Sequence, residues 1–402
     1  MLFDYLPALL RESKTKIVLL VMDGLGDLPD ARSRLTPLEA AQTPHMDRLA
    51  AEGILGRSVP IRPGITPGSG PAHLALFGYD PIQYTVGRGV MEALGIGMDI
   101  GPGDVAARGN FCTLDAAGLI SDRRAGRIPS DEAIPVVKTL QDIKLDGAEA
   151  EVRHVKEYRF ALVLRGEGLE GDIEDTDPQV TGAKPLEPVA RSAGSQKAAK
   201  LFNDWTHKAI NILAGQPKAN GLTLRGFGGD PKLPKYKDVY GLKAACVAVY
   251  PMYRGVASLV GMDLISFQGE APADEFAAVL ENWANYDYFF VHIKKTDSMG
   301  EDGNFDGKAK IIEGLDQALP LLLDFKPDVI AITGDHSTPV PMRSHSWHPV
   351  PLLLWSAHHV FADEQVQFGE HNCAKGGLGT IPATDLMPLM LAHAGRLEKF
   401  GA

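Results

Sequence analysis

The sequence is poor in cysteine. Three cysteines occur among 402 residues, at positions 112, 246 and 373, and no two of them form a CxxC pair. Cysteines this far apart are typical of free thiols, so we expect a protein of the reducing cytoplasm. Internal repeats and low-complexity tracts are also absent from the sequence.

Long hydrophobic runs and a basic excess are missing as well. The longest apolar runs, such as residues 17–22, are too short to cross a bilayer, and the first five residues lack the pattern of a signal peptide. Lys and Arg number 40 against 51 Asp and Glu, which gives a net charge of −11. The short apolar runs argue against a membrane partner, and this charge balance argues against a nucleic-acid partner. It allows a small anionic substrate held by a local arginine cluster. The sequence leaves open whether the chain forms a homo-oligomer.

Length and hydrophobic pattern indicate an α/β protein of two domains. A chain of 402 residues exceeds what one ordinary core supports. Residues 16–22 form a continuous apolar run, as expected of a strand buried on both faces of a parallel sheet, and residues 286–293 and 328–333 also have the character of strands. Between about residues 84 and 260, the strand-like runs are shorter and separated by polar stretches.

Acidic residues follow these three predicted strands. Asp23 comes directly after the first, Asp297 lies beyond the second, and Asp335 follows the third, with His336 beside it. Because the carboxyl ends of parallel strands meet at one edge of a sheet, we expect these side chains to converge there. His345, which precedes another short apolar strand, would join them. Carboxylate and imidazole ligands suit divalent ions such as Mn²⁺, Zn²⁺ or Mg²⁺.

A serine lies between two glycines in the segment 67–74. We expect Ser69 to begin a short helix, because an apolar run follows it at residues 74–77. Free backbone N–H groups and the helix dipole favour an anion at such an end. The hydroxyl is compatible with an ordinary helix cap, or with a nucleophile that receives a phosphoryl group. The strand-end acids favour the nucleophile, since two metal ions could clamp a phosphoryl group beside it.

Arginines accumulate in the middle of the chain, and three of them fall within five residues, 123–127. Guanidinium groups bind carboxylates and phosphates bidentately, so we interpret this cluster as an oxyanion grip; a solvated surface loop is the alternative. The candidate substrate-binding residues are Arg108, Arg123, Arg124, Arg127, Arg225 and Arg254.

A series of motifs identifies a family resemblance over nearly the whole chain. The motifs are MDGLGD (22–27), TPLEAAQTPHMDRLA (36–50), PGSGPAHLALFGYDP (67–81), GRGVMEALGIG (87–97), GDVAARGNF (103–111), DRRAGRI (122–128), GLKAACVA (241–248), LVGMD (259–263), TGDHSTPV (333–340) and GGLGTI (376–381). The chain resembles the archaeal-type cofactor-independent phosphoglycerate mutases of the alkaline phosphatase superfamily. The resemblance implies an alkaline-phosphatase-like doubly wound sheet core formed by residues 1–83 and 259–402. Residues 84–258 would form a second, inserted α/β domain that binds substrate.

The resemblance also implies residue roles. Ser69 would be the nucleophile that interconverts 3-phosphoglycerate and 2-phosphoglycerate through a phosphoserine, without 2,3-bisphosphoglycerate. Two divalent ions would be needed, Mn²⁺ first, with Mg²⁺, Zn²⁺ or Co²⁺ as alternatives. One ion would be held by Asp23, Ser69, Asp335 and His336, and the other by Asp297, His345 and residue 301. The arginines would hold the glycerate.

Residue 301 departs from the family pattern. The family motif runs Asp-x-x-x-His from the position of Asp297, whereas this chain has Glu301 at its end. A carboxylate there predicts a harder metal preference, away from Zn²⁺. Alternatively, the second metal is weakly held, or Asp302 or His292 contributes. Three other functions stay open: a metal-dependent phosphomonoesterase, a homoserine-kinase-like phosphotransferase, and a non-catalytic paralogue that binds phosphoglycerates.

Overall fold

The computed structural model describes residues 2–401, so the terminal residues 1 and 402 of the expected core range lie outside it. The chain divides into two compact units. The first combines the segment up to Thr85 with the segment from Leu233 onward, and the second is Val86–Lys232. The expected return to the core at residue 259 is therefore too late. Residues 244–248 form a strand of the first unit's sheet, paired in parallel with residues 288–292.

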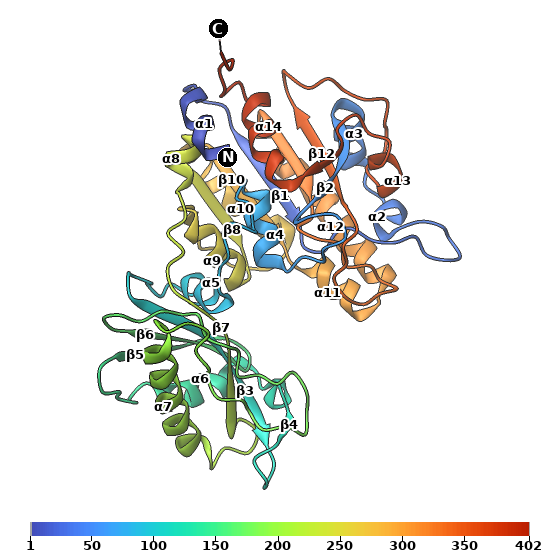
Figure 1. The fold of residues 1–402 in the computed structure, drawn as a ribbon. Coiled ribbons are helices and arrows are strands. Elements are labelled where there is room, and N and C mark those ends of the chain that lie inside the picture. The colour runs from blue at the N-terminus through green and yellow to red at the C-terminus, as the bar shows by residue number, and fades with distance from the viewer. Residues whose placement is uncertain (1, 402) are drawn as a thin grey trace. The chain divides into compact units, whose positions relative to one another are not determined.

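The first unit is built on an eight-stranded sheet of order β13-β2-β12-β11-β1-β10-β8-β9 (Figure 1). Its strands are β1 (Ile17–Met22), β2 (Ile54–Val59), β8 (Ala244–Ala248), β9 (Asp263–Leu264), β10 (Tyr288–Ile293), β11 (Val329–Thr333), β12 (Val350–Ser356) and β13 (Gly379–Pro382). β1 lies between β10 and β11 and is parallel to both, whereas β12 runs antiparallel to its neighbours β11 and β2. The predicted α/β class is confirmed, with a sheet that is mixed and mostly parallel.

Helices cover both faces of this sheet. They are α1 (Leu2–Tyr5), α2 (Pro37–Ala40), α3 (Pro44–Glu52), α4 (Ser69–Leu76), α8 (Tyr236–Tyr240), α9 (Pro251–Leu259), α10 (Pro272–Glu281), α11 (Lys295–Asp302), α12 (Phe305–Leu323), α13 (Glu370–Cys373) and α14 (Leu386–His393). Alternate residues of β1, from Val18 to Met22, share a core with α3, α10 and α12. On the opposite face, His73 of α4 contacts Phe290, and Tyr253 of α9 stacks on His292. Burial on both faces explains why the strand sequences are apolar without alternation.

The second unit carries an antiparallel five-stranded sheet of order β4-β3-β6-β5, with β7 paired to β3. Its elements are α5 (Arg88–Gly95), β3 (Asp104–Leu114), β4 (Ile120–Asp122), α6 (Ser130–Leu140), β5 (Glu149–Lys156), β6 (Arg159–Arg165), α7 (Gln196–Leu213) and β7 (Gly221–Gly228). Trp205 and Phe202 of α7 pack with Phe160 and Phe227 of the sheet to form a separate hydrophobic core.

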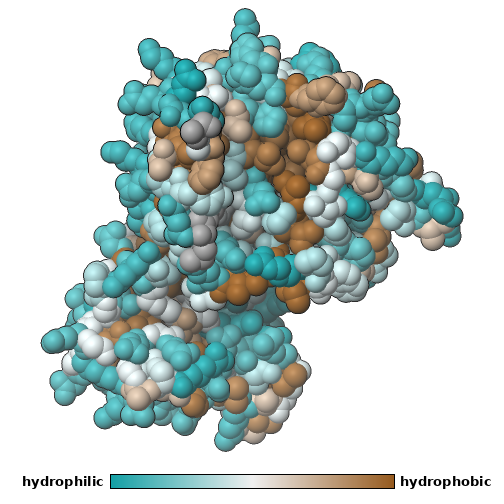
Figure 2. Space-filling view, turned by 45° about the horizontal axis from the view of Figure 1, so that its top comes forward, coloured by the Kyte–Doolittle hydropathy of each residue, from teal (hydrophilic) through white to brown (hydrophobic). Residues whose placement is uncertain are grey.

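Two further features are the character of the surface and the state of the cysteines. Figure 2 shows a face covered largely by hydrophilic residues, with hydrophobic residues gathered in places. All three cysteines are buried and free. Among residues 2–401, the helices lack the combination of length and apolarity that a membrane span requires.

Candidate active site

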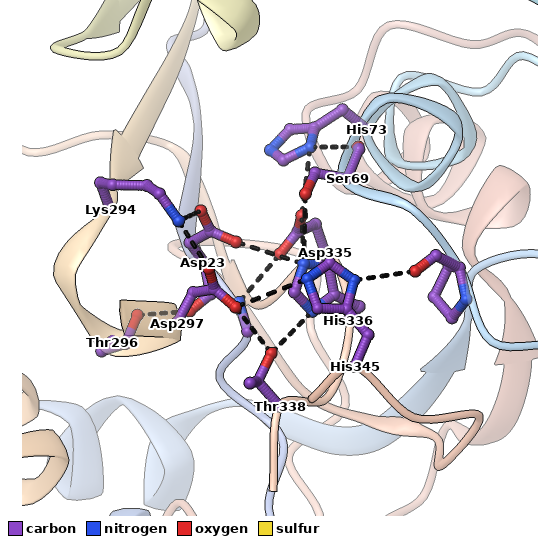
Figure 3. Close-up of polar contacts among 12 residues, drawn as sticks. Asp23, Ser69, His73, Lys294, Thr296, Asp297, Asp335, His336, Thr338 and His345 are labelled. Carbon is purple, nitrogen blue, oxygen red and sulfur yellow. Dashed lines mark hydrogen bonds and ion pairs between the residues drawn. The ribbon is translucent and has the colours of Figure 1, made fainter. Parts of the chain in front are cut away.

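The first cluster of polar side chains lies where β1 and β11 end. Asp23 directly follows β1, and Asp335 and His336 follow β11, so the parallel pairing of the two strands brings all three side chains to one edge. His336 Nε2 lies 3.3 Å from Asp23 Oδ1 and 3.3 Å from Asp335 Oδ2, and all three side chains are fully buried (Figure 3). Asp23, Asp335 and His336 form one group with the geometry to hold a cation.

A second group contains Asp297, His336 and His345. Asp297 lies in the first turn of α11 rather than at the end of a strand. His345 Nε2 is 3.6 Å from Asp297 Oδ1. His345 reaches this edge because β12, which follows it, runs antiparallel to β11 and therefore begins where β11 ends. Its Nδ1–H donates to the carbonyl of Pro67 at 3.0 Å, which leaves Nε2 directed at the site.

Ser69 is the first residue of α4, as predicted, with Gly68 as the helix cap. Its Oγ lies 3.3 Å from His336 Nε2, so the hydroxyl borders the first group. One turn further on, His73 donates through Nδ1–H to the Ser69 carbonyl at 2.8 Å. Burial lowers the pKa of His73 to about 4, so this imidazole is neutral. The serine is thus held by its backbone while its hydroxyl stays available.

Lys294 is a site residue that the sequence analysis missed. Its ammonium lies 2.8 Å from Asp23 Oδ2 and 2.6 Å from Asp297 Oδ2, and so links a carboxylate of each group (Figure 3). Tyr253, also missed, donates its hydroxyl to Asp23 Oδ2. Burial favours the neutral form of Asp23, but the Lys294 ammonium, His336 and His292 together outweigh burial and hold the pKa of that carboxyl well below its usual range. By contrast, burial and the neighbouring Asp23 charge raise the pKa of Asp335 to about 8.

The donor set fits divalent metal ions. Within residues 2–401, the buried oxygens Asp23 Oδ1 and Asp335 Oδ2 accept no hydrogen bond. A buried carboxylate oxygen that accepts no hydrogen bond costs free energy, which a bound cation would offset. Each group combines carboxylate and imidazole ligands, the kind that Mn²⁺ and Zn²⁺ accept.

The three candidates for the remaining ligand of the second group, Glu301, Asp302 and His292, differ in burial and in their distance from that group. Glu301 lies one helical turn beyond Asp297 on α11, its side chain is exposed, and it belongs to neither group found among the described residues. Partial burial and the nearby Asp297 charge raise its pKa. Asp302 is exposed too. His292 is buried with Nε2 3.7 Å from Asp23 Oδ2, so it approaches the first group rather than the second.

Three predicted arginines come together within the second unit. Arg108 of β3 and Arg225 of β7 are directly paired across the strands. Arg225 contacts Asp177 at 3.5 Å, and Arg123 binds the same carboxylate at 2.8 Å. Burial lowers the pKa of Arg108 to about 10, and its nearest acid, Glu92, lies 3.8 Å away.

The other arginines are placed differently. Arg124 and Arg127 are exposed on the same unit. Arg254 belongs to the first unit, where Nη1 donates to the backbone carbonyls of Ile265 at 2.7 Å and Ala248 at 3.4 Å. Arg88, which the sequence analysis did not select, lies 3.5 Å from Glu92 at the start of α5. The only local feature of the sequence that could have marked Arg88 as a candidate is its position between two glycines.

A mixed α/β sheet that gathers carboxylates, imidazoles and a serine hydroxyl at one edge defines a class of metal-dependent enzymes with a serine in the site. Residues 50–219 match the sequence profile of the family described as 2,3-bisphosphoglycerate-independent phosphoglycerate mutase. The chain belongs to this family, whose members are isomerases.

Relatives and solved structures support this assignment over the full length. A protein of Thermotoga maritima named "Probable 2,3-bisphosphoglycerate-independent phosphoglycerate mutase" is 50% identical over 401 residues, 99% of each chain. One of the same name from Thermus thermophilus is 49% identical over 405 residues, 100% of each chain. The structure of PH0037 from Pyrococcus horikoshii matches with a TM-score of 0.84, 34% identity and coverage of 97% of this chain and 100% of that one. The structure of a cofactor-independent phosphoglycerate mutase from Thermoplasma acidophilum matches with a TM-score of 0.71 and 31% identity, and the match covers 95% of this chain and 100% of that one.

Proposed function

We propose that the protein interconverts 3-phosphoglycerate and 2-phosphoglycerate without 2,3-bisphosphoglycerate, through a phosphoserine at Ser69. The observation that carries this proposal is the position of the Ser69 hydroxyl, 3.3 Å from His336 Nε2, because His336 belongs to both candidate metal groups. A nucleophile placed there would meet a phosphoryl group at the point where positive charge is concentrated.

Two divalent ions would complete the site. Asp23, Ser69, Asp335 and His336 would hold one ion. Asp297 and His345 would hold the other, with Glu301 as the third ligand to be tested. We favour Mn²⁺, with Mg²⁺, Zn²⁺ or Co²⁺ as alternatives. When bound, such ions would stabilise the negative charge of the phosphoryl group and of the serine oxygen.

The chain's own residues would then act in a defined order. Ser69 Oγ attacks phosphorus while the bond from phosphorus to the glycerate oxygen breaks, and the departing glycerate oxygen takes up a proton in place of the one that the serine loses. The freed glycerate stays held by arginines, for which Arg108, Arg123 and Arg225 are the first candidates, with Arg124, Arg127 and Arg254 after them. After the glycerate turns over, its other hydroxyl attacks the phosphoserine and restores Ser69.

The substrate is a small molecule, and we place the protein in the cytoplasm because its cysteines are unpaired.

A coupled assay tests this proposal. Conversion of 3-phosphoglycerate to 2-phosphoglycerate is followed with added Mn²⁺ and without 2,3-bisphosphoglycerate, while free phosphate is monitored. We expect isomerisation without phosphate release. Release of phosphate would indicate a phosphomonoesterase instead. Absence of both signals in folded, metal-loaded protein would favour the homoserine-kinase-like or the non-catalytic alternative.

A further inference from the structure

Thr338 contacts two candidate metal ligands. One is His336, which belongs to both groups, and the other is Asp297, which belongs only to the second group. Its hydroxyl oxygen lies 2.8 Å from Asp297 Oδ1 and 3.1 Å from His336 Nδ1 (Figure 3). The side chain is fully buried, and it follows His336 by two residues in the loop after β11. This hydroxyl therefore bridges a carboxylate and an imidazole that would both face metal.

The chemistry of these contacts sets their direction. A threonine hydroxyl has one proton to donate, and an ionised carboxylate only accepts. The hydroxyl therefore donates to Asp297 and accepts the Nδ1–H of His336. Nε2 of the same ring faces Asp23 and Asp335, each 3.3 Å away. When a bound cation takes the place of the Nε2 proton, the ring keeps its proton on Nδ1 and offers the Nε2 lone pair to the cation. Partners of this kind determine which imidazole nitrogen can ligate a metal.

The buried side chain of Lys308 holds the backbone of Thr338 in place. The Lys308 ammonium, fully buried in the first turn of α12, donates to the Thr338 carbonyl at 3.0 Å and to the Gly24 carbonyl at 2.8 Å. It also pairs with Asp27 Oδ2 at 2.7 Å. The Thr338 N–H in turn donates to the Gly26 carbonyl at 3.0 Å. Lys308 thus joins the loop that carries Asp23 to the loop that carries His336.

We propose that Thr338 is a positioning residue, which selects the metal-ligating tautomer of His336 and couples it to Asp297, and that Lys308 fixes Thr338 for this task. The inference rests on the two-metal site of the proposed function. It predicts that the threonine hydroxyl controls metal affinity, although it touches neither substrate nor metal.

The test compares Thr338→Val, which keeps the shape and removes the hydroxyl, with Thr338→Ser, which keeps the hydroxyl. Mn²⁺ is titrated into each metal-free protein, and free Mn²⁺ is counted by electron paramagnetic resonance. We expect Thr338→Val to weaken binding of the two ions by about 10–100-fold, the usual effect of losing such a partner, and Thr338→Ser to restore affinity to near that of the unsubstituted protein. Thr43→Val is the matched control, because its buried hydroxyl also faces a carboxylate, Asp47, at 3.4 Å but lies in neither group.

Unchanged affinity for both ions in folded Thr338→Val would overturn the inference, as would an equal loss in Thr43→Val. If Thr338→Val does not fold by circular dichroism, Thr338→Ala takes its place under the same criteria. If the unsubstituted protein binds fewer than two Mn²⁺ ions, the two-metal site itself is wrong, and the inference falls with it. Two ions in the unsubstituted protein together with an unaffected Thr338→Val would refute the inference alone.

Discussion

Replacing Lys308 with Met should destabilise the first unit strongly. The Lys308 ammonium is fully buried and serves Asp27 and the carbonyls of Gly24 and Thr338. Methionine keeps the length of the side chain but leaves the Asp27 carboxylate buried without its cation. Breaking a buried ion pair on one side costs about 3–5 kcal/mol. For a large domain, this corresponds to a fall in Tm of roughly 6–20 °C.

Thermal unfolding of metal-free protein, followed by circular dichroism in the presence of a chelator, measures this effect. The double variant Lys308→Met with Asp27→Asn separates the charge from the packing. The asparagine carbonyl oxygen can still accept the N–H groups of Leu28 and Val340, which bind Asp27 Oδ1 at 2.8 and 2.9 Å. We expect the second substitution to recover about 1–3 kcal/mol of the loss. A double variant that is no more stable than Lys308→Met would refute the charge argument, and an unchanged Tm in Lys308→Met would refute the whole account of this cluster.

Three further predictions concern the nucleophile, the metal and pH. Ser69→Ala should abolish turnover in the coupled assay while Mn²⁺ still binds through Asp297 and His345; full activity would rule out a phosphoserine. Glu301→His should shift the metal preference toward Zn²⁺ in competition titrations, and an unchanged preference would mean that residue 301 is no ligand. Burial, reinforced by Asp274, raises the pKa of Glu275 from its ordinary 4.5 to about 9. The protonated Glu275 carboxyl therefore contributes folding stability that is complete below pH 4.5 and is lost as the pH rises through 9. Glu275→Gln should therefore flatten the decline in Tm between these pH values, and an unaltered decline would show that Glu275 is not its source.

Much of the site could be predicted because its signals are local. The apolar run before Asp23 and the one before Asp335 each show a buried strand and the residue at its end. The glycine before Ser69 and the apolar residues after it likewise show where α4 begins. Each of these inferences needs only a few neighbouring residues, and the parallel pairing of β1 with β11 then brings the two acids together.

The remainder depends on contacts between distant segments. The run 244–248 is apolar in either unit, and only its pairing with β10 places it in the first. His345 reaches the site through the reversed direction of β12, which its sequence does not reveal. Lys294 looks like an ordinary polar residue until the fold brings it to Asp23, and Thr338 until the fold brings it to Asp297. The exposure of Glu301 likewise does not follow from its spacing to Asp297, because residues four apart share a helix face and Asp297 is buried.

The covalent intermediate is the central claim, and trapping it is the most direct test. Metal-loaded protein is mixed with 3-phosphoglycerate, quenched in acid within one turnover, digested, and examined by tandem mass spectrometry. The account predicts a phosphoryl group on Ser69 in the unsubstituted protein and an unmodified peptide in Ser69→Ala. A phosphoryl group on another residue, or isomerisation at full rate in Ser69→Ala, would contradict it.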